Sequence, residues 1–310
     1  MQVWDRPSGA DALPVPRKRI STLTPQVSVI AFAHDPGRRQ ALGVSADKAP
    51  GRYADVEGIK LYYEIHGSGR PTILLHGGLG ATSMFGPNLD ALARGRQIIA
   101  VDLQGHGRTA DVDRPIRVEL MARDIAALIT HLKLDKPDLV GYSLGGGVAF
   151  FAALRNPDLV RRLVIISTPF RRDAYYPDIL RQQGQVTAEA AEAMKQTPMY
   201  ELYASIAPRP QDWGRLLGKI GESMKEDFDW VSELPKLKPQ TMIVAGDADI
   251  FPPAHATEVF GALGGGKQDG GWDGSGRPRH RLAILPGVTH YAMAVAPALA
   301  PTISAFLDEP

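Results

Sequence analysis

Gly141-Tyr142-Ser143-Leu144-Gly145 lies between a short apolar segment at 136–140 and a longer, largely apolar segment at 146–154. The first segment predicts a buried strand, and the second predicts a helix. A Ser between a strand and a helix, with Gly two residues away on either side, indicates a tight turn with a strained backbone at the Ser. Such a turn presents the Ser143 hydroxyl above the edge of a sheet, beside the amide groups of a helix N-terminus.

From residue 51 onward, short apolar runs alternate with amphipathic segments. Further buried strands are predicted at 72–75, 97–101, 163–166, 241–245 and 281–285, and a hairpin at 53–56 and 59–65. Helices are predicted at 84–94, 118–132, 254–263 and 294–307. This alternation predicts an α/β fold with a mostly parallel sheet that helices cover on both faces.

The alternation stops between residues 170 and 234, where the sequence is poor in strands, helical in tendency and rich in Tyr, Trp and Met. We interpret this stretch as a helical cap, inserted into a core formed by residues 51–169 and 235–310. Residues 264–279 are rich in Gly but lack the spacing of a phosphate-binding loop, so we expect a flexible surface loop there. Residues 1–50 show little periodicity and predict a poorly ordered N-terminal extension.

Composition narrows the class of protein. The chain has 310 residues, of which 44% are hydrophobic and 22% charged, as in a soluble globular protein with a sizeable core. A formal net charge of +1 gives no reason to expect nucleic acid or an anionic membrane as a partner, and no apolar run is long enough to span a membrane. The lack of cysteine excludes disulfides, thiolate metal sites and a Cys nucleophile.

Residues 1–33 bear on the compartment. Arg17-Lys18-Arg19, the moderately apolar residues 27–30 and Ala31-Phe32-Ala33 faintly resemble an export signal. Residues 24–26 interrupt the apolar part, which also starts far from Met1. We therefore expect a cytoplasmic protein, and an exported one in the alternative that residues 1–33 act as a signal.

A Ser hydroxyl needs a base within hydrogen-bond reach, and the base needs an acid that orients it. Asp247 and Asp249 follow the strand predicted at 241–245, and His290 follows the strand predicted at 281–285. Because the carboxyl ends of parallel strands meet at one edge of a sheet, these groups are expected to converge on Ser143. Asp249 is the preferred acid because it lies further into the loop, whereas Asp247 suits local turn hydrogen bonds. For His106, a structural role in its loop is preferred over a place in the site.

A glycine-rich turn, His76-Gly77-Gly78-Leu79-Gly80, directly follows the strand predicted at 72–75. Backbone N–H groups in such a turn can stabilise the negative charge that develops on an attacked carbonyl oxygen. The N–H of Leu144, next to Ser143, is the expected second donor. Gly78 and Leu79 both remain candidates for the first, and Gly78 is preferred.

Taken together, these segments resemble the α/β-hydrolase fold family from about Arg52 to Leu307. The resemblance rests on five segments in the family's order: 75–78, 101–108, 141–146, 246–249 and 286–290. It implies a mostly parallel, eight-stranded sheet, a cap after the sixth strand and a triad of Ser143, His290 and Asp249. Residues 1–50 have no counterpart in the basic fold.

The resemblance also sets an expectation for the activity. Family members with Ser at this turn favour hydrolysis of carboxylic esters, and the same triad serves lactones, amides, C–C bonds and peracid formation. We expect a small-molecule ester as substrate, with no cofactor and no metal, and the sequence predicts no oligomeric state. Leu79 and Tyr142 are candidates for the substrate pocket, although the Tyr142 side chain could equally pack under the turn. A ligand receptor without catalysis is the less favoured alternative.

Overall fold

The computed structural model describes residues 51–309, so the extension expected at residues 1–50 lies outside the described residues. The strands are β1 (Arg52–Val56), β2 (Ile59–His66), β3 (Arg70–Leu75), β4 (Arg96–Val101), β5 (Asp138–Tyr142), β6 (Arg162–Ile166), β7 (Gln240–Ala248) and β8 (Arg281–Thr289). They form one eight-stranded sheet in the order β1-β2-β4-β3-β5-β6-β7-β8. β2 is antiparallel to both of its neighbours, and the pairs from β4 to β8 are parallel. The predicted sheet is confirmed.

The first two strands form the predicted hairpin. Val56 pairs with Ile59 across a two-residue turn in which Glu57 has φ 47° and Gly58 has φ 76°. Positive φ at both turn residues matches the right-handed twist of the flanking strands, which explains why a Gly is used there.

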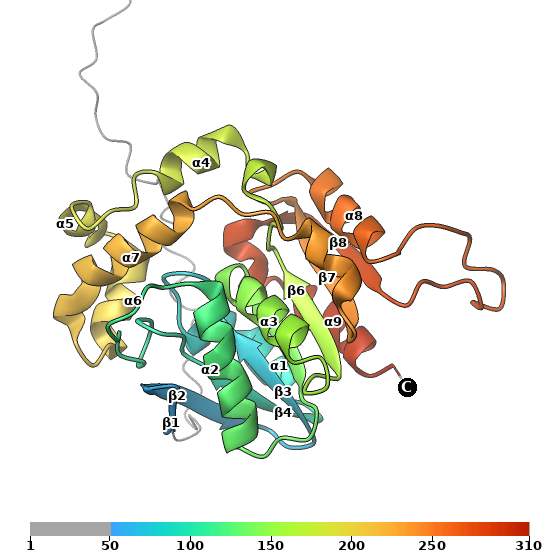
Figure 1. The fold of residues 1–310 in the computed structure, drawn as a ribbon, viewed down its shortest axis with the longest axis horizontal. Helices are drawn as coiled ribbons and strands as arrows, with labels where there is room; N and C mark the ends of the chain where they lie inside the picture. The colour runs from blue at the N-terminus through green and yellow to red at the C-terminus, as the bar shows by residue number, and fades with distance from the viewer. Residues whose placement is uncertain (1–50, 310) are drawn as a thin grey trace, which may run out of the picture. The chain divides into compact units, whose positions relative to one another are not determined.

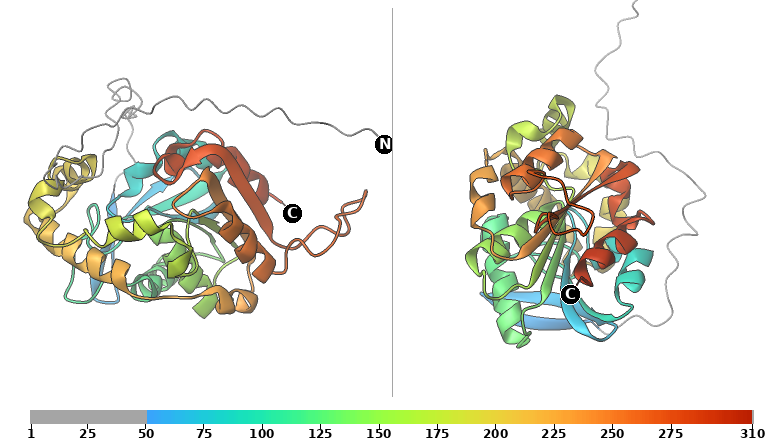
Figure 2. Two further views of the ribbon diagram at one scale, coloured as in Figure 1. Left: turned by 90° about the horizontal axis from the view of Figure 1, so that it is seen from above. Right: turned by 90° about the vertical axis from the view of Figure 1, so that its right-hand side faces the viewer.

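Two layers of helices cover the sheet. On one face lie α2 (Val118–His131), α3 (Leu144–Arg155) and α8 (Pro253–Ala262), and on the other lie α1 (Pro87–Leu92) and α9 (Leu299–Leu307). The right-hand view of Figure 2 shows the sheet between the green helices α2 and α3 and the cyan and red helices α1 and α9. No helix among residues 51–309 is long and apolar enough to cross a lipid bilayer.

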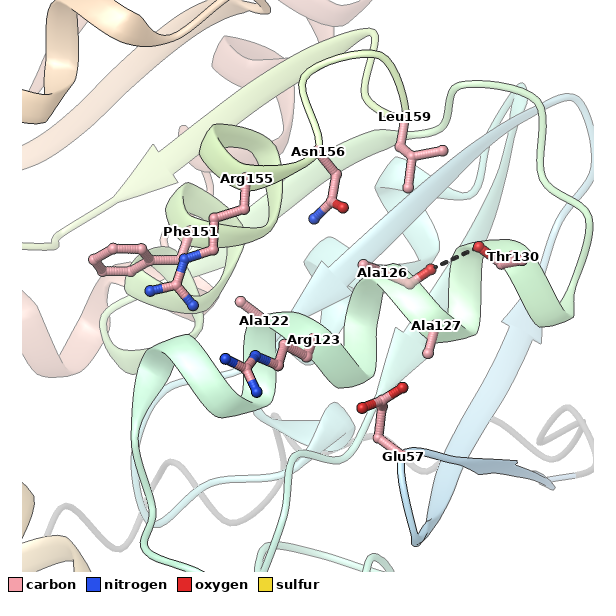
Figure 3. Close-up of a pocket in the computed structure, with 10 residues that line it drawn as sticks. All are labelled: Glu57, Ala122, Arg123, Ala126, Ala127, Thr130, Phe151, Arg155, Asn156 and Leu159. Carbon is pink, nitrogen blue, oxygen red and sulfur yellow. Dashed lines mark hydrogen bonds between the residues drawn. The ribbon is translucent and has the colours of Figure 1, made fainter.

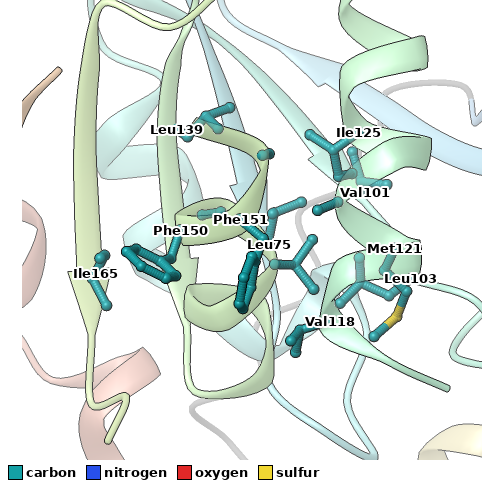
Figure 4. Packing of buried hydrophobic residues seen from close by; sticks show 14 of the residues in the cluster. Leu75, Val101, Leu103, Val118, Met121, Ile125, Leu139, Phe150, Phe151 and Ile165 are labelled. Carbon is teal, nitrogen blue, oxygen red and sulfur yellow. The ribbon is translucent and has the colours of Figure 1, made fainter. Parts of the chain in front are cut away.

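Successive side chains along each strand point to opposite faces of the sheet and pack into two separate hydrophobic cores. Ile73 and Leu75 of β3 point into the core on the α2 and α3 face, whereas Leu74 points into the core on the α1 and α9 face. Figure 4 shows the first core, where Phe150 and Phe151 of α3 pack against the apolar face of α2 and the sheet. Both aromatic rings are buried, so this contact fixes α3, and with it the turn at Ser143.

Two predicted helices differ from the structure because of proline. The helix predicted at 84–94 is split into a 3₁₀ turn, Thr82–Phe85, and α1, since Gly86 has φ 47° and Pro87 starts a new helix. The helix predicted at 294–307 begins only at Leu299, after a 3₁₀ segment, His290–Val295. Ala296 precedes Pro297 and is extended, as the proline ring requires.

Between β6 and β7 the chain forms a helical insertion. Its elements are the 3₁₀ turn Arg172–Ala174, α4 (Pro177–Gln183), α5 (Ala191–Met194), α6 (Pro198–Ile206), the 3₁₀ turn Pro210–Asp212, α7 (Trp213–Lys225) and the 3₁₀ segment Val231–Lys236. The two ends of the insertion meet. The backbone N–H of Trp230 donates to Phe170 O at 2.7 Å, and Arg171 and Asp229 form an isolated antiparallel β-bridge. Figure 1 shows α4, α5, α6 and α7 grouped together, away from α9.

Candidate active site

The turn between β5 and α3 has the strained geometry expected from the sequence. Ser143 has φ 54° and ψ −117°, in the left-handed region that non-glycine residues rarely adopt. A Cβ at Gly141 would lie 2.2 Å from Gly145 O, and a Cβ at Gly145 would lie 2.5 Å from His76 O. Only glycine therefore fits on either side of Ser143, which is the physical reason for the G-x-S-x-G spacing.

The proposed acid and base are in contact. Asp249 follows β7 and His290 follows β8, and both side chains are buried. His290 Nδ1 lies 2.8 Å from Asp249 Oδ1. Because a carboxylate only accepts, Nδ1 carries the proton and donates it, and the lone pair of Nε2 is left available.

Hydrogen bonds keep the buried Asp249 carboxyl ionised. Burial by itself favours the neutral acid and would raise the pKa of Asp249. The hydrogen bond and the charge of His290 act in the opposite direction, and so do the hydrogen bonds from Ser167 and the Ile250 N–H. Together they outweigh burial and lower the pKa of Asp249 below its ordinary value. Asp249 Oδ1 also accepts from Ile250 N at 2.8 Å, and Oδ2 accepts from Gly246 N at 3.2 Å. A negative charge therefore faces the His290 imidazole at neutral pH.

Asp247, the competing acid, has a different environment. It is exposed, and its Oδ1 accepts a hydrogen bond of 2.8 Å from Gly287 N. The structure therefore brings Asp249, and not Asp247, to His290.

Tyr142 connects the turn to the base. Its hydroxyl donates to His290 O at 2.7 Å, and its ring centroid lies 5.2 Å from that of His290. The ring is 4% exposed, and burial raises the pKa of the Tyr142 hydroxyl. Tyr142 thus packs beneath the turn, the second of the two roles that its sequence position allows.

Within residues 51–309 the Ser143 hydroxyl makes no hydrogen bond to His290.

The two segments that carry the candidate oxyanion donors lie next to each other. A Cβ at Gly78 would lie 3.9 Å from Leu144 Cδ2, so the glycine-rich turn passes next to the start of α3. Leu144 is the first residue of α3, and a first helical N–H has no partner inside the helix. Leu79, the other pocket candidate, has φ 57° and is buried in the core on the α2 and α3 face.

Comparison with known proteins decides the family. A family model described as the alpha/beta hydrolase fold matches residues 71–197. Over 260 residues the chain is 34% identical to a protein of Azorhizobium caulinodans named "Putative carbamate hydrolase RutD", which covers 79% of this chain and 93% of that relative. The chain belongs to the α/β-hydrolase fold family.

Two further matches agree with this family. A protein of the same name from Rhizobium rhizogenes is 36% identical over 120 residues, which is 37% of this chain and 46% of the relative, so this match spans less than half of its length. A solved esterase from Thermogutta terrifontis has a TM-score of 0.63 at 23% identity and covers 84% of this chain and 98% of its own. The fold and the relatives of this chain are thus those of hydrolases.

In this α/β hydrolase, two buried histidines shape the loops around the site. His76 Nδ1 donates to Gly77 O at 2.7 Å, and its Nε2 accepts from Leu103 N at 3.0 Å, so it ties the glycine-rich turn to the loop after β4. Burial lowers the pKa of His76 to about 4, although the Gly77 hydrogen bond opposes this. His106 donates to Gln104 O at 2.8 Å, in agreement with the structural role that we prefer for it.

Sequence reasoning missed two side chains at the end of β6. Ser167 Oγ donates to Asp249 Oδ2 at 2.5 Å, and Thr168 Oγ1 donates to Ser143 O at 3.0 Å. In the sequence they are an ordinary Ser-Thr pair after an apolar run. The one available signal is their place at a strand end, on the sheet edge where the triad was expected.

A separate hollow of about 420 Å³ lies between α2 and α3 (Figure 3). Arg123 and Arg155 project into it, and Glu57 and Phe151 lie at its sides. None of the triad candidates lines it, so it is not the candidate active site.

Proposed function

We propose that this α/β hydrolase is a serine hydrolase that cleaves carboxylic esters through an acyl-enzyme intermediate. The observation that carries the proposal is the 2.8 Å hydrogen bond between His290 Nδ1 and Asp249 Oδ1. This pair lies on the sheet edge where the strained turn presents Ser143, and Tyr142 holds the His290 backbone to that turn. Acyl transfer requires a histidine whose unprotonated Nε2 can take the proton of a nearby serine hydroxyl, and the turn presents such a serine on this edge.

The first chemical step is attack on the ester carbonyl. Substrate binding shortens the separation between Ser143 Oγ and His290 Nε2 to a hydrogen bond, because such contacts are often long in the free enzyme. Ser143 Oγ then forms the bond to the carbonyl carbon as His290 takes its proton. The N–H groups of Leu144 and Gly78 stabilise the oxyanion, and one such donor typically contributes about 3 kcal/mol to lowering the barrier.

The second half of the reaction releases the acid. The proton on His290 passes to the alkoxide as the ester C–O bond breaks, which frees the alcohol and leaves the acyl group on Ser143. His290 then removes a proton from water, the hydroxide attacks the acyl carbon, and the proton returns to Ser143 as the acid leaves. Throughout both halves, Asp249 stabilises the imidazolium without taking its proton.

The helical insertion is proposed as a cap over this site that favours an apolar acyl or aryl group. It contacts the core loops, because a Cβ at Gly105 would lie 3.3 Å from Leu216 Cδ1 of α7. Many of its aromatic side chains serve packing instead: Trp230 stacks on Phe150, and Trp213 packs among α5, α6 and α7. The cap therefore offers an apolar environment, and no cluster of cations in it suggests an anionic substrate.

Replacing the nucleophile tests the proposal. Ser143→Ala should lower kcat on a nitrophenyl acyl ester by about 10⁴- to 10⁶-fold, as in other serine triads. The alanine keeps the fold, which a thermal melt would verify. Unchanged hydrolysis by a folded Ser143→Ala protein would show the assignment to be wrong.

Carbamate hydrolysis is the second candidate, and the names of the two relatives favour it. The same triad would form a carbamoyl-enzyme, so kinetics on matched substrates must separate the two. Esters, carbamates and lactones with equal acyl size, together with a vinylogous diketone for C–C cleavage, form a suitable panel. We expect the highest kcat/KM for an ester. A higher kcat/KM for a carbamate would identify carbamate hydrolysis, and not ester hydrolysis, as the main activity.

A further inference from the structure

The carboxyl end of β6 contacts both the nucleophile and the acid. Ile166 O accepts a hydrogen bond of 2.8 Å from Ser143 N, and the next two residues donate to Asp249 and to Ser143 O. We propose that Ser167 and Thr168 are positioning residues: Ser167 holds the acid, and Thr168 holds the peptide group that carries an oxyanion donor. This inference rests on the proposed function.

The two oxygens of Asp249 have separate partners. Oδ1 faces the imidazole of His290, whereas Oδ2 faces away from it and accepts from Ser167 Oγ at 2.5 Å and Gly246 N at 3.2 Å. Among residues 51–309, His290 is the one ion-pair partner of Asp249, so neutral donors on Oδ2 fix the plane of the carboxylate. Ser167 supplies the shorter of these contacts.

The backbone at Ser167 indicates that its side chain is used. Ser167 has φ 50°, a left-handed conformation that glycine would adopt without strain, and it is fully buried. Its N–H is bound to Val244 O at 2.8 Å, so the strained conformation is anchored between β6 and β7. A serine in this position is explained by the hydrogen bond that its hydroxyl makes to Asp249.

Thr168 acts on the other side of the site. Its hydroxyl lies 3.0 Å from Ser143 O and 3.1 Å from Ile166 O, so the two carbonyls share its one proton, and Gly146 N also donates to Ser143 O at 2.9 Å. Ser143 C=O and Leu144 N–H belong to the same planar peptide group, so a bond that fixes the carbonyl also fixes the direction of the N–H. It also polarises that N–H, which strengthens it as a donor to an oxyanion.

Packing leaves room for this hydroxyl only beside a glycine. A Cβ at Gly146 would lie 2.0 Å from Thr168 Oγ1. Gly146, the second glycine of Gly145-Gly146-Gly147, and the threonine after β6 therefore fit each other, which links two segments that lie far apart in the sequence.

Two variants test Ser167. Ser167→Ala removes the donor, and Ser167→Gly removes it while relieving the backbone strain, so the glycine variant keeps its fold. We expect kcat/KM on a nitrophenyl acyl ester to fall about 10- to 100-fold in both, the range for losing a hydrogen bond to a charged group. With more negative charge left on Oδ1, the imidazolium is held more tightly, and the acidic limb of the kcat/KM profile should move to higher pH.

Ser205→Ala is the matched control, because Ser205 is exposed on α6 and, in the part of the chain that the structure describes, donates to Leu202 O alone. It should leave both the rate and the pH profile unchanged. An acidic limb that stays in place in the folded Ser167→Gly protein would overturn the role of Ser167, and so would failure of both Ser167 variants to fold.

Thr168→Val and Thr168→Ser test the second half. The valine is nearly isosteric but cannot donate, so kcat should fall about 10-fold with little change in KM, as expected for a contact that matters in the transition state. The serine variant should recover most of this loss. Thr130→Val is the control, since Thr130 is exposed near the end of α2 and, within residues 51–309, its hydroxyl donates to Ala126 O alone. A loss confined to KM, or no rescue by serine, would overturn the role of Thr168.

Ser143→Ala, assayed in parallel, separates this inference from the proposed function. If Ser143→Ala is inactive while the Ser167 and Thr168 variants behave like wild type, the hydrolase assignment stands and the positioning roles are wrong. If Ser143→Ala retains activity, the proposed function itself fails, and the positioning roles fail with it.

Discussion

At the scale of single residues, Asp249 and Asp247 show how two carboxylates close in sequence acquire different roles. Asp249 is buried with four hydrogen-bond donors around it, whereas Asp247 lies at the surface and caps Gly287 N. Asp249→Asn should therefore lower kcat by about 10⁴-fold, because an amide cannot hold the imidazole in the tautomer with a free Nε2. Asp247→Asn should stay within about threefold of wild type, since an amide oxygen still accepts from Gly287 N.

Steady-state kinetics of the two variants on one ester would check this prediction. Equal losses in both, or a larger loss for Asp247→Asn, would contradict the role given to Asp249. Because both side chains stay nearly isosteric, differences in packing do not confuse the comparison.

Some of these residue roles could be predicted from the sequence, and others could not. The roles of Ser143 and His290 could be predicted because each lies within a few residues of the end of a predicted strand and because glycine spacing marks the turn at Ser143. Ser167 and His76 were not, because their roles depend on contacts with Asp249 and Leu103, which lie far away in the chain. A hydroxyl or an imidazole at a strand end carries no local sign of its partner.

At the scale of elements, α7 is joined to the loop after β4 through Lys219. Its ammonium group donates to Asp111 Oδ2, Val112 O and Arg114 O, each at 2.7 Å, and Asp111 is buried. Lys219→Met would leave a buried carboxylate with one cationic partner fewer and two carbonyls without this donor. We expect a loss of about 2–3 kcal/mol in the free energy of unfolding.

Urea unfolding of this variant beside Lys236→Met checks the prediction. Lys236 pairs with Glu233 on an exposed turn, so its loss should cost less than about 0.5 kcal/mol. Similar costs for the two substitutions would show that Lys219 does not anchor α7. The contact could not be predicted from the sequence, because Lys219 and Asp111 lie 108 residues apart. Nothing near Lys219 in the sequence identifies its partner.

Element types were easier to predict than element ends. The buried strands and α2 follow from apolar runs and helical spacing, and both are confirmed. The ends of α1 and α9 were wrong because Gly86-Pro87 and Pro297 act on the backbone, whereas the apolar pattern continues across them.

At the scale of the whole molecule, Asp124 predicts a dependence of stability on pH. It is buried on α2, its Oδ2 pairs with Arg114, and its Oδ1 has no partner among residues 51–309. Burial raises its pKa from 3.8 to about 6, although Arg114 opposes the shift. The folded state thus binds this proton more tightly than the unfolded state, so the contribution to stability is complete below about pH 4 and is lost as the pH rises through 6.

Comparison with Asp124→Asn isolates this effect, because asparagine does not titrate. From pH 3 to pH 7, the unfolding free energy of wild type should fall by about 3 kcal/mol relative to the variant, the equivalent of a two-unit shift in pKa. Denaturant unfolding at several pH values would measure the difference. A difference that does not change with pH would contradict the shifted pKa of Asp124.

The central claim, that Ser143 is a nucleophile activated by His290, is tested most directly by covalent labelling. A fluorophosphonate probe reacts with an activated serine, and mass spectrometry of the digested protein locates the adduct. We predict modification of the peptide that contains Ser143, no modification there in Ser143→Ala, and strongly slowed labelling in His290→Ala. An unlabelled Ser143 in the folded wild-type protein, or equal labelling without His290, would contradict the account.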